Sequence, residues 1–145
     1  MEKILVPIDG SETSVKAAQV AIDLAEKFGS EVTLLTVTFI PDEVYNFYLR
    51  TNYEQLSVLA EAYADNNQKM LASVEDQIDA KGVKISKKVV PGINHEAIVD
   101  EAEKGNFDLI VIGRRGLSRI KRLFIGSVTE RVLNQAPCSV YVVKE

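Results

Sequence analysis

The chain has 145 residues, of which 46% are hydrophobic and 26% charged, a composition typical of one globular domain. Its formal net charge of -4 argues against a general binder of nucleic-acid backbones, because such proteins carry a basic excess. One cysteine, Cys138, excludes an internal disulfide, and the first residues lack the apolar run of a signal peptide, so we expect a cytoplasmic protein. No apolar run approaches the roughly 20 residues of a membrane-spanning helix. We therefore expect neither a membrane nor a nucleic-acid partner.

Strand-like and helix-like segments alternate in the first part of the chain. Ile4 to Ile8 is a short, almost wholly apolar run, which predicts a strand covered on both faces. Apolar residues then recur at helical spacing between Ser11, a suitable N-cap, and Gly29, a suitable C-terminal stop. Val32 to Val37 predicts the second strand.

The middle of the chain is the least regular part. Pro41 to Tyr53 is rich in aromatic residues without a clean period, and we expect these side chains to cover a sheet edge or a partner. A helical stripe runs from Leu56 to Ile78 with an interruption at Asn66 and Asn67. Val83 to Val90 alternates apolar and polar residues, which predicts a half-exposed third strand.

The last part of the chain repeats the strand and helix rhythm. Asn94 is expected to cap a helix that ends at Gly105, and Phe107 to Ile112 predicts the fourth strand. Ser127 to Asn134 predicts a short helix, and Cys138 to Val143 predicts the fifth strand, with Cys138 in the core. Alternating strands and helices imply parallel pairing with right-handed crossovers. The sequence thus predicts a single doubly wound α/β domain with a five-stranded parallel sheet and about four helices.

Three glycines and a serine follow the fourth predicted strand at defined spacing. Gly113, two residues, Gly116, nine residues and Gly126 precede Ser127, which opens a helix. In a doubly wound sheet ligands bind beyond the carboxyl ends of the strands. Glycine lets backbone amides approach a ligand, and a helix N-terminus attracts anions. The spacing matches neither a Walker A loop nor GxGxxG, yet it favours a phosphate site facing the loop after the first strand.

This spacing resembles the signature of a known family, the ATP-binding branch of the universal stress proteins. The likeness extends over residues 1–145, through ILVPIDGSETS, VTLLTV, FDLIVIGRRG and APCSVYVV. The resemblance implies one universal stress protein-like nucleotide-binding domain. It also implies the strand order 3-2-1-4-5, in which the first and fourth strands are neighbours.

The resemblance further implies which residues surround ATP. Asp9 would bond the ribose or adenine side, and the other residues would form the adenine wall, border the ribose or hold the phosphates through amides and hydroxyls. The implied set is Pro7, Ile8, Asp9, Val37, Ile112, Gly113, Arg115, Gly116, Gly126, Ser127, Val128 and Thr129. Mg²⁺ or Mn²⁺ would accompany the phosphates, and no protein ligand for the metal is predicted. Two positions depart from the family pattern: Thr36, where histidine is frequent, and Arg114, where a small hydroxyl residue is frequent.

Several of these residues have a plainer interpretation. The glycines alone are compatible with simple turns, and Asp9 is compatible with a helix cap that competes with Ser11. The basic residues between Arg114 and Arg122 are expected mostly to face solvent, and His95 is expected to be an exposed bystander.

Binding is favoured over catalysis by what the sequence lacks. The motifs that orient water and metal in kinases and GTPases are absent, so no catalytic residue is predicted and ATP hydrolysis is expected to be slow or nil. We expect a nucleotide-dependent regulatory protein of the stress response. The alternative is an interaction protein of the same fold that binds no nucleotide and acts through a dimer surface. The last predicted strand is apolar on both faces, and family members commonly dimerise through it, so we expect a homodimer with antiparallel copies.

Overall fold

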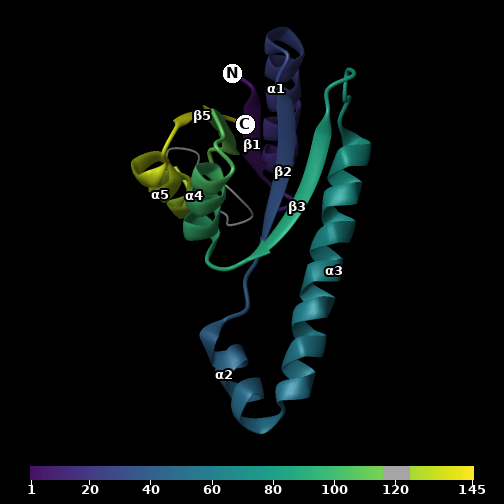
Figure 1. Cartoon of the computed structure of the whole chain (residues 1–145), viewed down its shortest axis with the longest axis vertical. Coiled ribbons are helices and arrows are strands. Elements are labelled where there is room, and N and C mark those ends of the chain that lie inside the picture. Colours follow the sequence, from purple (N-terminus) through teal and green to yellow (C-terminus); the bar gives the residue numbers. More distant parts are fainter. Residues whose placement is uncertain (116–124) are drawn as a thin grey trace.

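Five parallel strands form the centre of the domain in the computed structural model, which describes residues 1–115 and 125–145 (Figure 1). They lie in the order β3-β2-β1-β4-β5, so the strand order that the resemblance implied is confirmed. The strands are β1 (Lys3–Pro7), β2 (Glu31–Thr38), β3 (Ile85–Pro91), β4 (Leu109–Gly113) and β5 (Ser139–Val143). Strand β5 is an edge of this sheet, as expected.

The described part of the chain contains five helices, where about four were expected. They are α1 (Glu12–Phe28), α2 (Asp42–Thr51), α3 (Tyr53–Gln77), α4 (Asn94–Lys104) and α5 (Ser127–Gln135). The additional helix is α2, inside the irregular aromatic segment. It buries none of its residues, and the sequence analysis found no clean helical period in this segment. Among the described helices none is both long and apolar enough to cross a membrane.

The ends of α1 are where the sequence predicts them. The Ser11 hydroxyl accepts a hydrogen bond from the Ser14 amide at 3.1 Å, as an N-cap does. Gly29 closes the helix with φ 69°, in the left-handed region that glycine adopts without strain. Both predicted caps of α1 are therefore confirmed.

Asparagine residues have different roles at two places in the chain, and the expectation that Asn94 caps a helix is wrong. Helix α3 continues through Asn66 and Asn67, and the Asn67 side-chain amide donates to the Thr38 hydroxyl at 2.9 Å. A polar residue interrupts the apolar stripe here because it bonds to β2, and the helix itself is unbroken. Asn94 is the first residue of α4, and Ile93 occupies the N-cap without a side-chain hydrogen bond.

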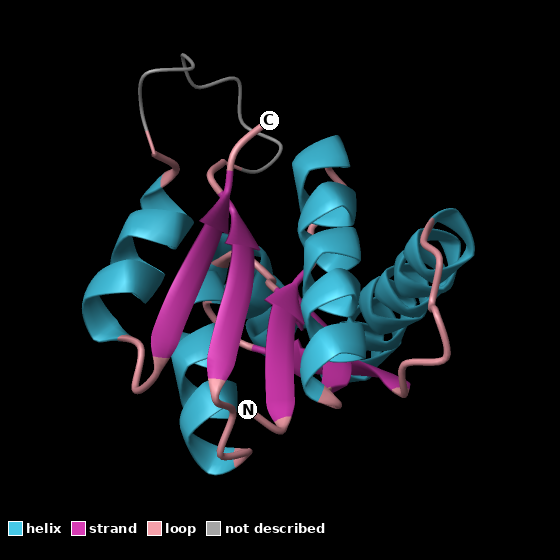
Figure 2. Ribbon diagram, turned by 90° about the horizontal axis from the view of Figure 1, so that it is seen from above, coloured by secondary structure: helices cyan, strands magenta, loops and turns pink. Residues whose placement is uncertain are grey.

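Alternating side chains of the strands build two hydrophobic cores, one on each face of the sheet. Helices cover both faces (Figure 2). The core under α1 and α3 contains Ile4, Val6, Leu34, Ala18, Ile22, Leu71 and Val74. The core under α4 and α5 contains Leu5, Leu35, Ile110, Ile98, Ala102 and Val132. Burial on both faces explains why the central strands β1 and β4 read as nearly continuous apolar runs.

Strands β1 and β4 pair over a shorter length than β1 and β2. Strand β1 matches β2 over the whole of Lys3–Pro7, but its register with β4 covers two positions, Ile4 with Leu109 and Leu5 with Ile110. Beyond Leu5 the two strands are no longer paired, and a crevice opens at their carboxyl ends. This is the point where strand order reverses, which is where ligands bind in such sheets. Pro7 lies beyond the last pair, so its missing N–H costs no bond to β4.

Candidate functional site

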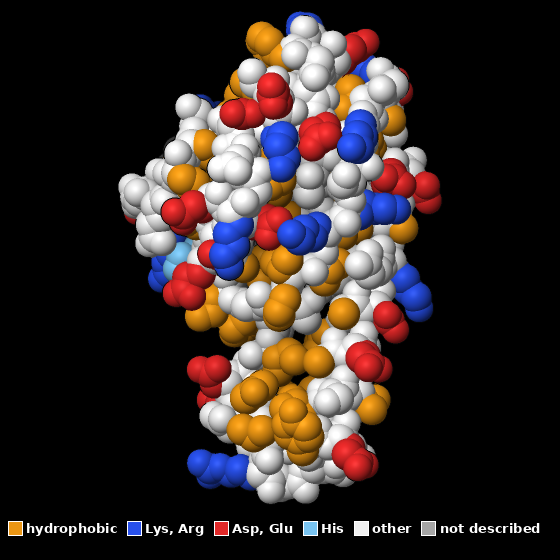
Figure 3. Space-filling view, viewed as in Figure 1, with side chains coloured by type: hydrophobic (Ala, Val, Ile, Leu, Met, Phe, Trp, Pro, Cys, Tyr) orange, Lys and Arg blue, Asp and Glu red, His pale blue; other side chains and the backbone are white. Residues whose placement is uncertain are grey.

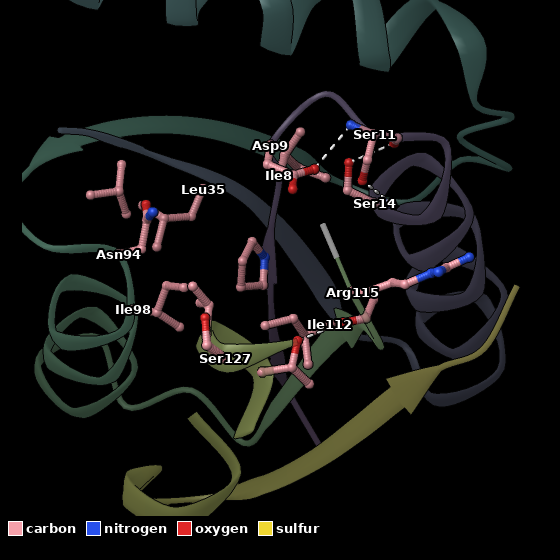
Figure 4. Close-up of a pocket in the computed structure, with 15 residues that line it drawn as sticks. Ile8, Asp9, Ser11, Ser14, Leu35, Asn94, Ile98, Ile112, Arg115 and Ser127 are labelled. Atoms are coloured by element: carbon pink, nitrogen blue, oxygen red, sulfur yellow. Dashed lines mark hydrogen bonds between the residues drawn. The ribbon is translucent and has the colours of Figure 1, made fainter. Parts of the chain in front are cut away.

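A cavity of about 300 Å³ lies at the carboxyl ends of β1, β2 and β4 (Figure 4). This volume is at the lower end of the range for small-molecule sites. Ten of the twelve predicted site residues line it: Pro7, Ile8, Asp9, Val37, Ile112, Gly113, Arg115, Ser127, Val128 and Thr129. Gly126 is described but is not part of the lining, and Gly116 lies outside the described residues.

Five further residues line the cavity that the sequence analysis did not select. They are Ser11 and Ser14 of the α1 N-terminus, Leu35 of β2, and Asn94 and Ile98 of α4. The sequence could have indicated that the starts of α1 and α4 lie near the site, because every helix that follows a parallel strand begins near that strand's carboxyl end. The apolar stripe of α4 gave no sign that its first turn reaches this particular crevice.

The N-termini of three helices converge on the cavity. Ser11 and Ser14 belong to α1, Asn94 begins α4 and Ser127 begins α5. Each helix N-terminus carries a partial positive charge, and together they make the cavity favourable for an anion. Figure 4 shows side chains from these three helix starts around one opening.

The first turn of α5 offers three backbone donors. Its N-cap, Gly126, has no side-chain cap, and the first bond within the helix runs from the Glu130 amide to the Gly126 carbonyl at 2.9 Å. The amides of Ser127, Val128 and Thr129 have no acceptor among the described residues. Such free N–H groups need an acceptor from water or a ligand. The Ser127 side chain is exposed beside them.

Two hydrogen bonds fasten the start of α5 to the end of β4. The Thr129 hydroxyl donates to the Gly113 carbonyl at 2.7 Å, and the Gly126 amide donates to the Arg114 carbonyl at 2.7 Å. Thr129 is 3% exposed. The Thr129 hydroxyl proton and the Gly126 N–H are thus already used within the chain. As far as the described residues show, the donors left for a ligand here are the amides of residues 127 to 129 and the Ser127 hydroxyl.

The described glycines of the signature are required by close approach. A Cβ on Gly113 would lie 2.7 Å from the Thr13 Cγ2 atom, and one on Gly126 would lie 3.2 Å from the Arg115 Cα atom. Neither Gly113 nor Gly126 has a positive φ. The simple-turn interpretation therefore does not account for these two glycines. Gly10, in the loop after β1, does adopt a positive φ of 85°.

Asp9 lies on the opposite rim, in the loop between β1 and α1. Its Oδ1 atom accepts from the Ser11 amide at 2.9 Å, which closes a turn and orients the carboxylate. The N-cap of α1 is Ser11, so the interpretation of Asp9 as the cap of that helix is wrong.

A carboxylate bridges the two described arginines that follow β4. Glu145 pairs with the Arg114 side chain, Nη2 to Oε2 at 2.6 Å, and with the Nε atom of Arg115. The pKa of the Glu145 carboxyl lies below its ordinary value, chiefly because its own backbone N–H donates to it and further because of Arg114. Arg114 and Arg115 are therefore paired and only partly exposed, whereas most of the basic cluster was expected to face solvent. The other basic residues of the cluster, Arg119, Lys121 and Arg122, lie outside the described residues.

Comparison with known proteins places this fold and site in one family. Residues 1–144 match the Universal stress protein family model. The chain belongs to the universal stress protein family. It is 35% identical over 144 residues to universal stress protein MJ0531 of Methanocaldococcus jannaschii, covering 99% of this chain and 82% of that relative.

Solved structures of other universal stress proteins share the fold. UspA from Lactobacillus plantarum superposes with a TM-score of 0.78 at 26% identity, covering 98% of this chain and 97% of the other. A universal stress protein solved in complex with cAMP has a TM-score of 0.68 at 25% identity, covering 98% and 95%. One similar protein thus binds an adenine nucleotide.

The two departures from the family pattern have structural explanations. Thr36 is 4% exposed, and its hydroxyl donates to the Ile8 carbonyl at 2.9 Å, so it holds the loop that leads to Asp9. Arg114 is tied to Glu145, and its buried Nε atom has no partner among the described residues. Both side chains support segments next to the cavity without lining it.

Neither His95 nor Cys138 is among the residues that line the cavity. The His95 side chain is 14% exposed, so the expectation that it is exposed to solvent is wrong. Its Nε2 atom lies 3.9 Å from a Glu96 oxygen. Cys138 precedes β5 and is half-buried, and burial raises the pKa of its thiol. No group of three or more histidine, cysteine or acidic side chains that could hold a metal occurs in residues 1–115 and 125–145.

Proposed function

We propose that this universal stress protein binds an adenine nucleotide, ATP foremost, in the crevice between β1 and β4, and that it acts as a nucleotide-dependent regulator. The observation that carries the proposal is the convergence of three helix N-termini on one cavity, with three amides at the start of α5 that have no acceptor among residues 1–115 and 125–145. The complex of a family member with cAMP supports an adenine ligand. The signature spacing from Gly113 to Ser127 supports ATP.

The proposed orientation follows from where donors and apolar walls lie. The phosphates would accept from the amides of Ser127, Val128 and Thr129 and from the Ser127 hydroxyl. Asp9, on the opposite rim, would accept from ribose or adenine donors. The apolar side chains of Pro7, Val37 and Ile112 line the same cavity and would contact the base.

The number of donors is sufficient for micromolar binding. Charge-assisted hydrogen bonds contribute about 1.5 to 3 kcal/mol each. Three or four of them give roughly 5 to 12 kcal/mol before the costs of association. Micromolar affinity corresponds to about 8 kcal/mol. Apolar contact with adenine would add to this sum, so micromolar binding is the expected range.

Arg115 would take part after exchanging its partner. It lines the cavity and is paired with Glu145 at the end of the chain. A polyphosphate carries more charge than one carboxylate and would compete for the guanidinium. Mg²⁺ or Mn²⁺ would be held by the phosphates and water, since the described residues offer no cluster of metal ligands.

We propose that hydrolysis is slow or nil. Fast phosphoryl transfer needs an oriented water, bound metal and stabilisation of transition-state charge. Asp9 is the one carboxylate among the described residues that line the cavity, and we assign it to the nucleoside. Steady phosphate release well above the no-protein background would overturn this part of the proposal.

The decisive experiment looks for bound nucleotide in two ways. Purified protein is denatured and the supernatant is analysed by chromatography for adenine nucleotides. Protein freed of ligand is then titrated calorimetrically with ATP, ADP, AMP and cAMP. We expect ATP to bind in the micromolar range and Asp9→Ala to weaken it. The absence of both released nucleotide and binding heat would reject the proposal and favour the interaction protein that binds no nucleotide.

We also propose a cytoplasmic homodimer formed through β5. This strand is an edge of the described sheet, and its outward Tyr141 is 47% exposed. An exposed edge with apolar side chains favours pairing with another strand. Two copies related by a twofold axis would pair their β5 strands antiparallel.

A further inference from the structure

Helix α2 and the first half of α3 project beyond the sheet as an arm (Figure 1). The hydrogen bond between Thr38 and Asn67 closes its base, so we define the arm as residues 39–66. Past this bond, α3 packs on the sheet through Leu71 and Val74. Within the arm, Leu56 is buried, and α2 buries no residue at all. The arm therefore adds little to the core of the domain.

The arm carries most of the exposed apolar surface in the described part of the chain. The described part of the chain has twelve exposed large hydrophobic side chains, and eight of them lie on the arm or directly beside it. They include Phe39 (50% exposed), Phe47 (61%), Tyr53 (67%), Val58 (64%) and Ile93 (48%). Figure 3 shows hydrophobic side chains gathered over this part of the molecule. Scattered exposed apolar residues are ordinary, but a cluster of this kind marks an interaction surface.

A second cavity, of about 550 Å³, lies where the arm meets the ends of β2 and β3. Its apolar lining includes Phe39, Tyr45 and Ile93, and two carboxylates, Asp42 and Glu61, also line it. None of the residues that line this second cavity also lines the cavity proposed for nucleotide between β1 and β4.

The arm also holds the net charge of the protein. Residues 39–66 contain five carboxylates and one arginine, and the remaining 16 acidic and 16 basic residues of the chain cancel. The carboxylates are Asp42, Glu43, Glu54, Glu61 and Asp65. None of the five has an ion-pair partner in residues 1–115 and 125–145. The surface is thus apolar and acidic at once.

We propose that the arm is a docking surface for a basic, amphipathic helical segment of another protein. Apolar side chains of the segment would enter the cavity beside Tyr45, and its Lys or Arg residues would pair with Asp42 and Glu61. Helix-in-groove recognition uses this combination, and complementary charge sets the choice of partner. An anionic membrane or a second copy of the same arm would bring like charges together, which disfavours both as occupants.

The test uses the full chain and a defined peptide. The probe is a fluorescein-labelled amphipathic helix of about 18 residues, with a leucine and phenylalanine stripe at i, i+3, i+4 and i+7 and lysines elsewhere. Fluorescence anisotropy is measured at low and high salt. One control peptide has the same composition in scrambled order, and another has glutamate in place of lysine. We expect the basic helix to bind, more weakly at high salt, and both controls to bind at least about tenfold more weakly.

Variants locate the binding on the arm. Asp42→Lys/Glu61→Lys is expected to lower peptide affinity about tenfold. The matched control Glu2→Lys/Glu103→Lys makes the same change of charge at two exposed sites away from the arm, and it is expected to lower affinity less than twofold. Tyr45→Ser, at a 45% exposed position, is expected to weaken binding without loss of helicity by circular dichroism.

Four results would overturn the proposal. Equal affinity for the helical and scrambled peptides would mean that charge alone attracts them. Equal loss in the two charge-reversal variants would place the peptide elsewhere. Flotation of the protein with phosphatidylserine vesicles, abolished by Tyr45→Ser, would make a membrane the occupant. Concentration-dependent self-association in sedimentation experiments, if abolished by Tyr45→Ser, would show that the occupant of the arm is a second copy of the chain.

Discussion

The hydroxyl of Thr129, in the first turn of α5, donates to the carbonyl of Gly113, the last residue of β4, at 2.7 Å. Sixteen positions separate the two residues. The bond fixes the start of α5 against the sheet, next to three amides that have no acceptor among the described residues. The donors proposed for phosphate are therefore held in place before a ligand arrives, which lowers the cost of binding.

Thr129→Val should destabilise the domain. Valine has a similar shape but cannot donate, so the Gly113 carbonyl loses its partner in a buried position. An unsatisfied buried acceptor costs about 1 to 3 kcal/mol in the free energy of unfolding. Urea denaturation measures the loss. Thr129→Ser keeps the hydroxyl and should be the more stable of the two; the reverse order would show that this bond contributes nothing.

Gly113→Ala should be destabilising for a steric reason that a second substitution can relieve. The added Cβ would meet the Thr13 Cγ2 atom at 2.7 Å, closer than real Cβ contacts. Overpacking of this kind costs about 1 to 3 kcal/mol. Thr13→Ser removes the opposing methyl group and should restore part of the loss. Thermal denaturation of both single variants and the double variant gives the coupling, and simple additivity would contradict the proposed contact.

Glu145→Gln should tighten ATP binding. The Glu145 carboxylate pairs with Arg115, which lines the nucleotide cavity, and the neutral amide would compete less with phosphate. An exposed pair of this kind changes affinity roughly two- to fivefold. Calorimetric titration at constant salt measures it. Glu103→Gln removes the same charge at an exposed site of α4 and should leave affinity unchanged. If Glu145→Gln binds ATP no better than Glu103→Gln, Arg115 does not contact phosphate.

The stability of the domain should depend on Asp108 in a definite pH range. The backbone N–H groups of Lys3 and Glu2 donate to its carboxylate at 2.9 and 2.8 Å and hold its pKa below the ordinary 3.8. A depressed pKa in the folded state stabilises the protein above pH 3.8, and this contribution is lost as the pH falls through the folded-state pKa. Asp108→Asn should therefore melt at a lower temperature than the parent at pH 7. The difference should shrink under acid, and a difference independent of pH would contradict this role.

Tyr141→Asp should convert the proposed dimer into a monomer. The side chain is exposed on the edge strand β5, and a charge there opposes pairing with a second copy. Light scattering at micromolar concentration reports the mass. Tyr141→Phe should remain dimeric. A monomeric parent protein would reject the dimer itself.

The fold could be predicted largely from the sequence because the strands are buried on both faces. The residues Leu109 to Ile112 of β4, for example, are all buried and all apolar, so a continuous apolar run marks this strand in the sequence. The order of the strands came from the family resemblance. Helix α2 was missed because the closely spaced aromatic residues of Pro41 to Tyr53 did not stand out as a helical stripe, and none of the residues of α2 is buried.

The candidate site could be predicted in part. Gly113 and Ser127 of the predicted spacing line the cavity, and so does Asp9 of the loop after β1. The contribution of Asn94 was missed because it depends on where α4 begins relative to β2. The pairing of Arg114 with Glu145 was missed as well, since no local pattern joins residues 31 positions apart.

The two cavities are lined by neighbouring residues of the same two segments. Val37 lines the cavity proposed for nucleotide, and the next residue, Thr38, lines the cavity at the arm. Likewise, Asn94 lines the first of these cavities and its neighbour Ile93 lines the second. A shift of either segment caused by one occupant would therefore move lining residues of both cavities. Thermodynamic reciprocity then requires that whatever factor nucleotide imposes on peptide affinity, peptide imposes on nucleotide affinity.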